Sequence, residues 1–363
     1  MLIGINCFKD VELCSIIESQ DMKGICEITG EVDVPVFNTD EDDILRDYIT
    51  EVLNIYSPAS DLPNDFPIEN LNYIEHILYE EWTIFNTSKE NIKRIIMELC
   101  KDAFSADSLL FIEKVGMEKL CDSEFLRRNS LLRESSWEKF MSSIKNINRF
   151  HSNHINLDLL NEFFCSSQMQ RIVQKDSGNL FRARISDENG IKMEEMGPPP
   201  AKLATAGRAN SSGISCLYLA NDIITAFHEI RARDLDYISV AFFKPNKDLK
   251  IVDLSNLDSI SPFSQFSQTS FDYEWFAINM SILKKISIEI AKPLRRQDSE
   301  LDYLPAQYIS DFVKSHGFDG ICYKSTLNKN GLNYAFFDYK KLKCVDVKLY
   351  HINALLYDSV LIR

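Results

Sequence analysis

The sequence predicts an α+β protein, with a mostly α-helical N-terminal domain followed by a mixed α+β C-terminal domain. Two patterns support this class. Before residue 170, apolar residues recur at three- and four-residue spacings, and few alternating β-branched runs occur. After residue 178, short apolar runs bounded by turn residues alternate with helical patterns. The length of 363 residues also fits two domains of roughly 150 residues each.

The first part of the chain is predicted to hold a small leader and a helical domain. In residues 1–30, three cysteines surround an amphipathic segment at 10–18, and a small ribbon or hairpin is expected there. The helical domain is placed at residues 31–170. Its stripes include Ile44, Tyr48, Val52 and Ile55, and later Ile92, Ile95, Ile96 and Leu99. Proline and aspartate in residues 57–67 predict a loop between two helices.

The second part is predicted to alternate strands with helices. Three runs are typical of strands, at residues 215–220, 237–243 and 250–254. Three helices are expected at residues 222–233, 273–286 and 305–316, and Gly317 follows the last one as its terminating glycine.

Composition restricts the partners and the compartment. The formal net charge is −14, and much of the excess acid lies in the first third, as in residues 40–43. Such a surface repels phosphate backbones and anionic membranes, so we predict neither a nucleic-acid nor a membrane partner. The N-terminus lacks the pattern of a signal peptide, and the nine cysteines form no compact framework. A cytoplasmic location is therefore expected.

Two patches offer arginines. Arg182 and Arg184 flank Ala183 in a predicted strand, so both point the same way, and the guanidinium fork suits a diphosphate. The sequence does not say which of the two faces a ligand. In residues 196–214, glycines allow a close backbone approach, and Arg208 and Asn210 supply donors. Taken alone, these patches also fit a solvated strand face and a surface turn.

Two further patches offer a carboxylate and a hydroxyl. A strand carrying Tyr218 is followed by a helix in which Thr225, Ala226 and Glu229 share one face. A carboxylate there can stabilise an oxocarbenium ion or orient a nucleophile. Ser325 ends a later strand, where it can hydrogen-bond a ribose or an amide. Taken alone, these residues also fit a surface carboxylate and a capping serine.

In this order, the four patches resemble the RES domain family, toxins of bacterial toxin-antitoxin systems, over residues 178–345, with residues 346–363 left as a tail. The most specific stretch is Pro198 to Glu229, with its Pro-Pro-Pro, Gly-Arg-x-Asn-x-x-Gly-Ile, Leu-Tyr-Leu-Ala and Thr-Ala-x-x-Glu motifs. The resemblance implies a fold similar to ADP-ribosyltransferases and the hydrolysis or phosphorolysis of NAD. NAD is then the substrate, and no cofactor is expected.

The resemblance also implies residue roles. It makes Arg182, Glu229 and Ser325 the family's arginine, glutamate and serine, and we predict them as catalytic residues. Four residues are predicted to bind the substrate: Arg184, as the rival of Arg182, with Arg208, Asn210 and Tyr218.

The N-terminal region resembles a helical extension found before some RES domains, which often carries two Cys-x-x-Cys pairs. The corresponding positions here are Gly4, Cys7, Cys26 and Thr29. Half of a tetrahedral thiolate set is missing, so we predict no metal, although the sequence leaves open whether Cys7 and Cys26 bind one.

Three other functions compete with NAD degradation. Helical HEPN domains cleave RNA with an Arg-x4-6-His motif, which Arg149 and His154 match weakly. ADP-ribosyl transfer to a macromolecule would use the same pocket. A third interpretation is a sensor or oligomerisation module without activity. We predict the NAD-degrading enzyme, acting as a toxin or phage-defence effector. It would be restrained by an antitoxin, a trigger or its own helical domain, and the helical domain could also form a homodimer.

Overall fold

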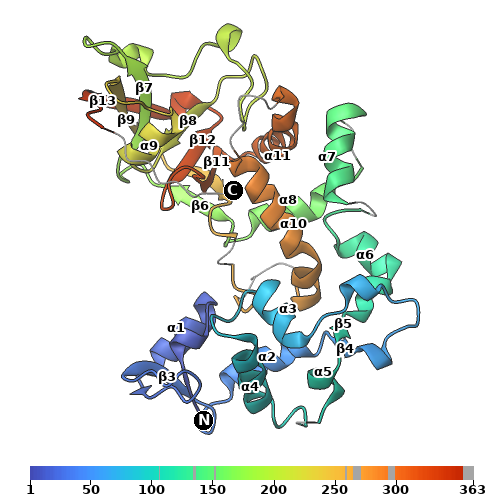
Figure 1. Ribbon diagram of the computed structural model, residues 1–363. Helices are drawn as coiled ribbons and strands as arrows, with labels where there is room; N and C mark the ends of the chain where they lie inside the picture. The colour runs from blue at the N-terminus through green and yellow to red at the C-terminus, as the bar shows by residue number, and fades with distance from the viewer. Residues whose placement is uncertain are drawn as a thin grey trace, which may run out of the picture. The chain divides into compact units, whose positions relative to one another are not determined.

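A computed structural model describes residues 1–105, 107–133, 136–150, 153–257, 260–264, 271–292 and 299–354, and it confirms the α+β class (Figure 1). The chain divides into two compact units whose segments interleave in sequence. Unit 1 comprises Met1–Ser135, His154–Leu159 and Leu257–Lys284, and unit 2 comprises Ser136–Asn153, Leu160–Asn256 and Lys285–Arg363. The domain limits expected at residues 30, 170 and 345 stay predictions.

Short amphipathic helices dominate the N-terminal part of the chain, as predicted. They are α1 Val11–Ser19, α2 Ile44–Leu53, α3 Ile74–Glu80, α4 Lys89–Leu99, α5 Leu109–Ile112, α6 Ser123–Asn129, α7 Trp137–Asn146 and α8 Leu157–Cys165. The Ser88 side chain caps α4, and the predicted stripe of this helix is buried. In α2 the predicted stripe is confirmed only in part, because Val52 is buried, whereas Ile44 is exposed and Ile55 lies beyond the end of the helix. The buried face of α2 carries Leu45, Ile49, Val52 and Leu53.

The expected small ribbon is present as a three-stranded sheet of β1 Leu2–Gly4, β3 Val34–Asn38 and β2 Lys23–Gly24, but its central strand β3 lies beyond the predicted leader of residues 1–30. The four positions of the degenerate cysteine motif converge beside it. The Sγ atoms of Cys7 and Cys26 lie 3.7 Å apart, and the backbone amides of Gly4 and Thr29 donate to Cys26 Sγ at 3.1 and 3.4 Å. Among the described residues, no three metal-binding side chains form a group. The absence of a metal stays a prediction.

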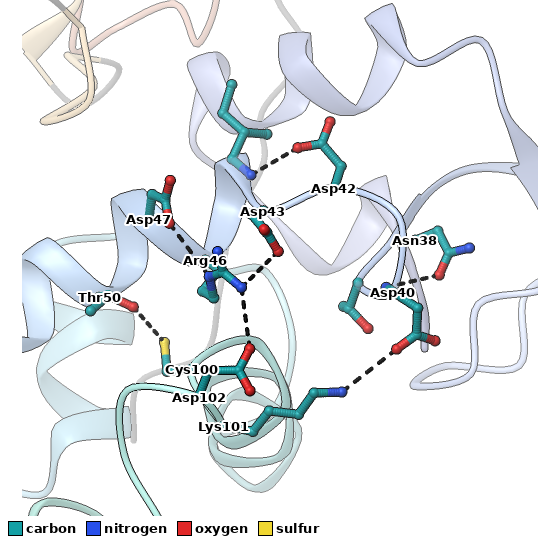
Figure 2. A network of polar contacts seen from close by, with 12 residues as sticks. Asn38, Asp40, Asp42, Asp43, Arg46, Asp47, Thr50, Cys100, Lys101 and Asp102 are labelled. Carbon is teal, nitrogen blue, oxygen red and sulfur yellow. Dashed lines mark hydrogen bonds and ion pairs between the residues drawn. The ribbon is translucent and has the colours of Figure 1, made fainter.

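An ion network surrounds the start of α2 (Figure 2). Arg46 Nη1 lies 2.7 Å from Asp43 Oδ1 and 3.2 Å from Asp102 Oδ2, and Lys101 Nζ lies 3.6 Å from Asp40 Oδ1. The network joins α2 and the acidic loop before it to the turn that follows α4. Exposed ion pairs of this kind contribute little stability, so unit 1 depends mainly on its buried apolar helix faces.

Unit 2 is built on an eight-stranded sheet with the order β13-β9-β7-β8-β12-β11-β10-β6. Every neighbouring pair is antiparallel except β10 and β11, which run parallel. The strands are β6 Gln170–Val173, β7 Leu180–Ser186, β8 Leu217–Ala220, β9 Tyr237–Pro245, β10 Leu249–Asp253, β11 Gly320–Lys324, β12 Leu332–Phe336 and β13 Leu342–His351. The three strands expected at 215–220, 237–243 and 250–254 are confirmed as β8, β9 and β10.

The helices expected in this part are also confirmed, as α9 Ile223–Glu229, α10 Tyr273–Ala291 and α11 Leu304–Ser315. Gly317 has a φ of +82°, which suits its role after α11. Alternate residues of β9 join different apolar clusters, because successive side chains point to opposite faces of a sheet. α9 packs on β7 and β8, and α11 packs on β11 and α7. No helix of the described residues is long and apolar enough to span a bilayer.

Candidate active site

The candidate site is a cavity of about 310 Å³ in unit 2, where β7 and β8 separate. β7 pairs with β9 along its whole length, whereas it shares only the pair Phe181 and Ala220 with β8. Both strands line the resulting cavity together with one face of α9 and Tyr303, the residue just before α11. The lining residues are Phe181, Arg182, Ala183, Gly207, Arg208, Tyr218, Leu219, Ala220, Ala226, Glu229, Ile230, Tyr303, Tyr323 and Asn333.

The two predicted arginines of β7 have different surroundings. Arg182 lines the cavity, and its Nη1 is buried without a hydrogen-bond partner among the described residues. Burial, with a smaller effect from Arg184, lowers the pKa of the Arg182 guanidinium to about 10. Arg184 is exposed, lies outside the cavity lining and donates to the carbonyl oxygen of Glu195 at 2.7 Å. The structure thus places Arg182 at the cavity and Arg184 outside it.

Glu229 lies at the end of α9, on the helix face expected from its spacing to Thr225 and Ala226, which are both buried. The Asp222 side chain caps this helix by accepting from the amide of Thr225 at 2.8 Å. The Glu229 carboxylate lines the cavity and is fixed by two neutral donors, since Oε1 accepts from Ser325 Oγ at 2.9 Å and from Asn333 Nδ2 at 2.7 Å.

Arg208 faces the second oxygen of the same carboxylate. Its Nη1 lies 3.7 Å from Glu229 Oε2, and its guanidinium lies 5.8 Å from the centre of the Tyr323 ring. The Arg208 side chain is only 12% exposed. A pocket wall therefore carries a carboxylate with a cation beside it, and the buried Arg182 guanidinium lines the same cavity.

Asn210 and Tyr218 use their polar groups to shape the loop that carries Arg208. Asn210 Nδ2 donates to the carbonyl oxygens of Thr205, Ser211 and Ile214, at 2.9 to 3.1 Å. The Tyr218 hydroxyl donates to Asn210 Oδ1 at 2.7 Å and accepts from the Ala209 amide at 2.9 Å. Burial raises the pKa of Tyr218 well above 10, which keeps this hydroxyl a donor. Tyr218 lines the cavity, whereas Asn210 does not.

The glycine at position 207 was expected to let the backbone approach a ligand. Gly207 lines the cavity, so this expectation stays a prediction, and the structure adds a second reason for glycine. A Cβ atom on Gly207 would lie 2.7 Å from both Asn210 Oδ1 and the Tyr218 hydroxyl. The close approach to these two side chains therefore also requires glycine.

Replacing Asn210 with alanine should lower the free energy of unfolding by on the order of 3 kcal/mol, because three carbonyl groups and the Tyr218 hydroxyl lose their partner inside the protein. Urea unfolding measures this loss. Asn246→Ala is the control, since Asn246 is exposed and makes one side-chain hydrogen bond to Lys340. A loss no larger than that of the control would contradict the assigned role.

Among the lining residues that sequence reasoning missed, three carry polar groups on their side chains. Asn333 could have been found from the sequence, because it is a lone amide in the apolar run 332–336. Nothing in the sequence distinguishes Tyr323 and Tyr303 as site residues, since an aromatic residue in a strand or before a helix fits an ordinary core.

The competing RNase interpretation rests on Arg149 and His154. Arg149 is exposed and His154 is partly buried, while residues 151 and 152 between them lie outside the described residues. This interpretation, and with it a HEPN-like N-terminal domain, stays a prediction.

Of the comparisons with known proteins, the family match alone bears on the cavity. No curated protein matches the chain. Among solved structures, a chain in the crystal structure of the M. tuberculosis MbcT-MbcA toxin-antitoxin complex is similar at 13% identity, over 50% of this chain and 87% of that chain, with a TM-score of 0.27. That likeness is too low to support a statement on function. The family described as "RES domain" matches residues 179–358, which include every residue of the cavity lining. The C-terminal part of this chain, residues 179–358, thus matches the RES domain family.

Proposed function

We propose that the chain is an NAD glycohydrolase or phosphorylase, which cleaves the bond between nicotinamide and ribose. One observation carries the proposal. One cavity within the RES match is lined by two largely buried arginines and by a carboxylate that neutral donors hold in place. The arginines suit the diphosphate of NAD, and the carboxylate suits the cation that forms when nicotinamide leaves.

The arrangement favours a ligand that carries negative charge. Arg182 Nη1 has no hydrogen-bond partner within the described part of the chain, and such a buried donor gains most from a charged acceptor. A volume of about 310 Å³ is near the lower end for ligand pockets, so the cavity would hold only part of a dinucleotide. We propose that it holds the nicotinamide ribose and the diphosphate, while the adenosine lies outside it.

The main requirement of the reaction is electrostatic stabilisation of the positive charge that forms when nicotinamide leaves. When the N-glycosidic bond breaks, its electron pair goes to the pyridinium nitrogen, and nicotinamide departs as a neutral molecule. The ribose carbon becomes an oxocarbenium ion, which the Glu229 carboxylate stabilises. Water or phosphate then attacks this carbon, and with water one proton is released. Ser325 and Asn333 serve by holding Glu229, because both donate to its Oε1.

The test is the release of nicotinamide from NAD by the purified chain, with the co-product identified by mass. Free ADP-ribose would indicate hydrolysis, and ADP-ribose 1″-phosphate formed in the presence of phosphate would indicate phosphorolysis. ADP-ribose attached to a macromolecule would show that the enzyme is an ADP-ribosyltransferase instead. If calorimetry detects no NAD binding and no nicotinamide is released, the proposal is wrong.

Such an activity would deplete the NAD of its own cell. We therefore also propose that the protein acts in the cytoplasm as a toxin or phage-defence effector, and that an antitoxin or another inhibitory partner, a trigger or the helical part of the chain restrains it. Free turnover of NAD by the purified protein would argue against restraint by its own helical part.

A further inference from the structure

Helix α11 holds the loop that carries Arg208. Gln307 lies on this helix, and its side chain is 5% exposed. Gln307 Nε2 donates to the carbonyl oxygen of Gly207 at 2.8 Å and to that of Asn210 at 2.9 Å, while its Oε1 accepts from Ser211 Oγ at 3.4 Å. One side chain thus bonds both ends of the four-residue turn 207–210.

Further hydrogen bonds hold the same turn. Its own backbone is closed by the bond from the Gly207 amide to the Asn210 carbonyl oxygen, at 2.9 Å. From β8, the Tyr218 hydroxyl binds the Ala209 amide and the Asn210 side chain. Gln307 provides the matching support from α11, so the turn is held between a strand and a helix. Arg208 projects from this turn toward Glu229.

The helix that carries Gln307 is itself braced within unit 2. The Tyr308 ring meets Phe140 of α7 edge-on, with ring centres 5.6 Å apart. Just before α11, Asp302 accepts from Lys145 of α7 at 2.6 Å. α7 lies outside the RES match, and it supports the helix that supports the arginine turn.

We propose that Gln307 is a positioning residue, which sets the place of Arg208 in the cavity by holding the turn 207–210 from helix α11. The positioning of the turn does not depend on the proposed function. Only the expected change in the KM for NAD rests on it. Glutamine suits this task because its amide nitrogen carries two hydrogens for two carbonyl groups and its oxygen accepts a third bond. Glutamate of the same size has no donor for either carbonyl at neutral pH, and leucine has no polar group at all.

The first test is the protection of the turn against hydrogen exchange. In Gln307→Leu and in Gln307→Glu, the amides of Gly207 and Ala209 should exchange roughly 10- to 30-fold faster, which corresponds to the loss of two neutral hydrogen bonds. Ser310→Ala is the matched control, because Ser310 is buried on the same helix and its hydroxyl donates to the carbonyl oxygen of Ala306 of that helix at 2.8 Å. Unchanged protection in both Gln307 variants, or an equal change in the control, would overturn the proposal.

The second test is kinetic and separates positioning from a general loss of stability. The kinetics are measured where urea unfolding shows each variant to be fully folded, because reversible unfolding by itself raises the apparent KM. Under these conditions a displaced Arg208 should raise the KM for NAD by about 10-fold. We expect the rise in KM in both Gln307 variants and not in Ser310→Ala. An active Gln307 variant with an unchanged KM for NAD would overturn the claim that Gln307 places Arg208 for NAD binding. If the wild type neither binds nor cleaves NAD, the proposed function fails, and hydrogen exchange still decides the role of Gln307.

Discussion

Replacing Glu229 with glutamine is expected to lower the rate of nicotinamide release by a factor of about 100 to 1,000, as the loss of one electrostatic stabiliser does in other enzymes. The substitution keeps the size of the side chain and an oxygen that can accept from Ser325 and Asn333. It removes the negative charge that would face the oxocarbenium ion. The effect should fall on kcat, because the charge is needed in the transition state more than in the bound substrate.

The control for this prediction is Glu188→Gln, since Glu188 is an exposed carboxylate of unit 2 outside the cavity lining. Nicotinamide release by both variants and the wild type is followed at saturating NAD. Binding of NAD to Glu229→Gln, measured by calorimetry, shows whether the cavity is intact. A variant that binds NAD and keeps the wild-type rate would exclude Glu229 from the chemistry.

Replacing Arg182 with methionine should have two effects of opposite sign. The protein should become more stable, because a buried guanidinium without a full set of partners is costly in the folded state. Burial lowers the pKa of Arg182 to about 10 in the folded protein, so the folded state carries the full cost at every pH below 10. The expected gain in the free energy of unfolding at pH 7 is on the order of 1–3 kcal/mol.

The affinity for NAD should fall in the same variant, by at least about 10-fold, because a charge-assisted hydrogen bond to the diphosphate is lost. Urea unfolding measures the first effect and calorimetry the second. Arg184→Met is the control, since Arg184 is exposed outside the cavity lining, and it should change both quantities little. An Arg182 variant that is less stable and binds NAD as the wild type does would contradict the role given to this residue.

Residue spacing and turn residues predicted the structure correctly where it depends on neighbouring residues of one segment. The repeat of Ile92, Ile95, Ile96 and Leu99 fixes the buried face of α4, because residues three and four apart share a face of a helix. The same spacing brings Glu229 to the face of α9 that carries Ala226, and both line the cavity. Gly317 marks the end of α11 through its positive φ.

Residue spacing could not predict which of Arg182 and Arg184 lies at the cavity. The alternation of a strand puts both side chains on one face, and the sequence goes no further. Only the departure of β8 from β7 after a single register pair opens a cavity beside Arg182 and leaves Arg184 exposed.

By itself, the sequence determined the α+β class, several of the helices and strands, and the set of segments proposed to carry the chemistry, because these depend on periodicity and turn residues a few positions apart. Tertiary structure alone decided what holds the site together. Ser325 and Asn333 reach Glu229 across 96 and 104 residues, and Gln307 reaches Gly207 across 100. Contacts at such separations are set by the pairing of strands and the packing of α11, which no local pattern encodes.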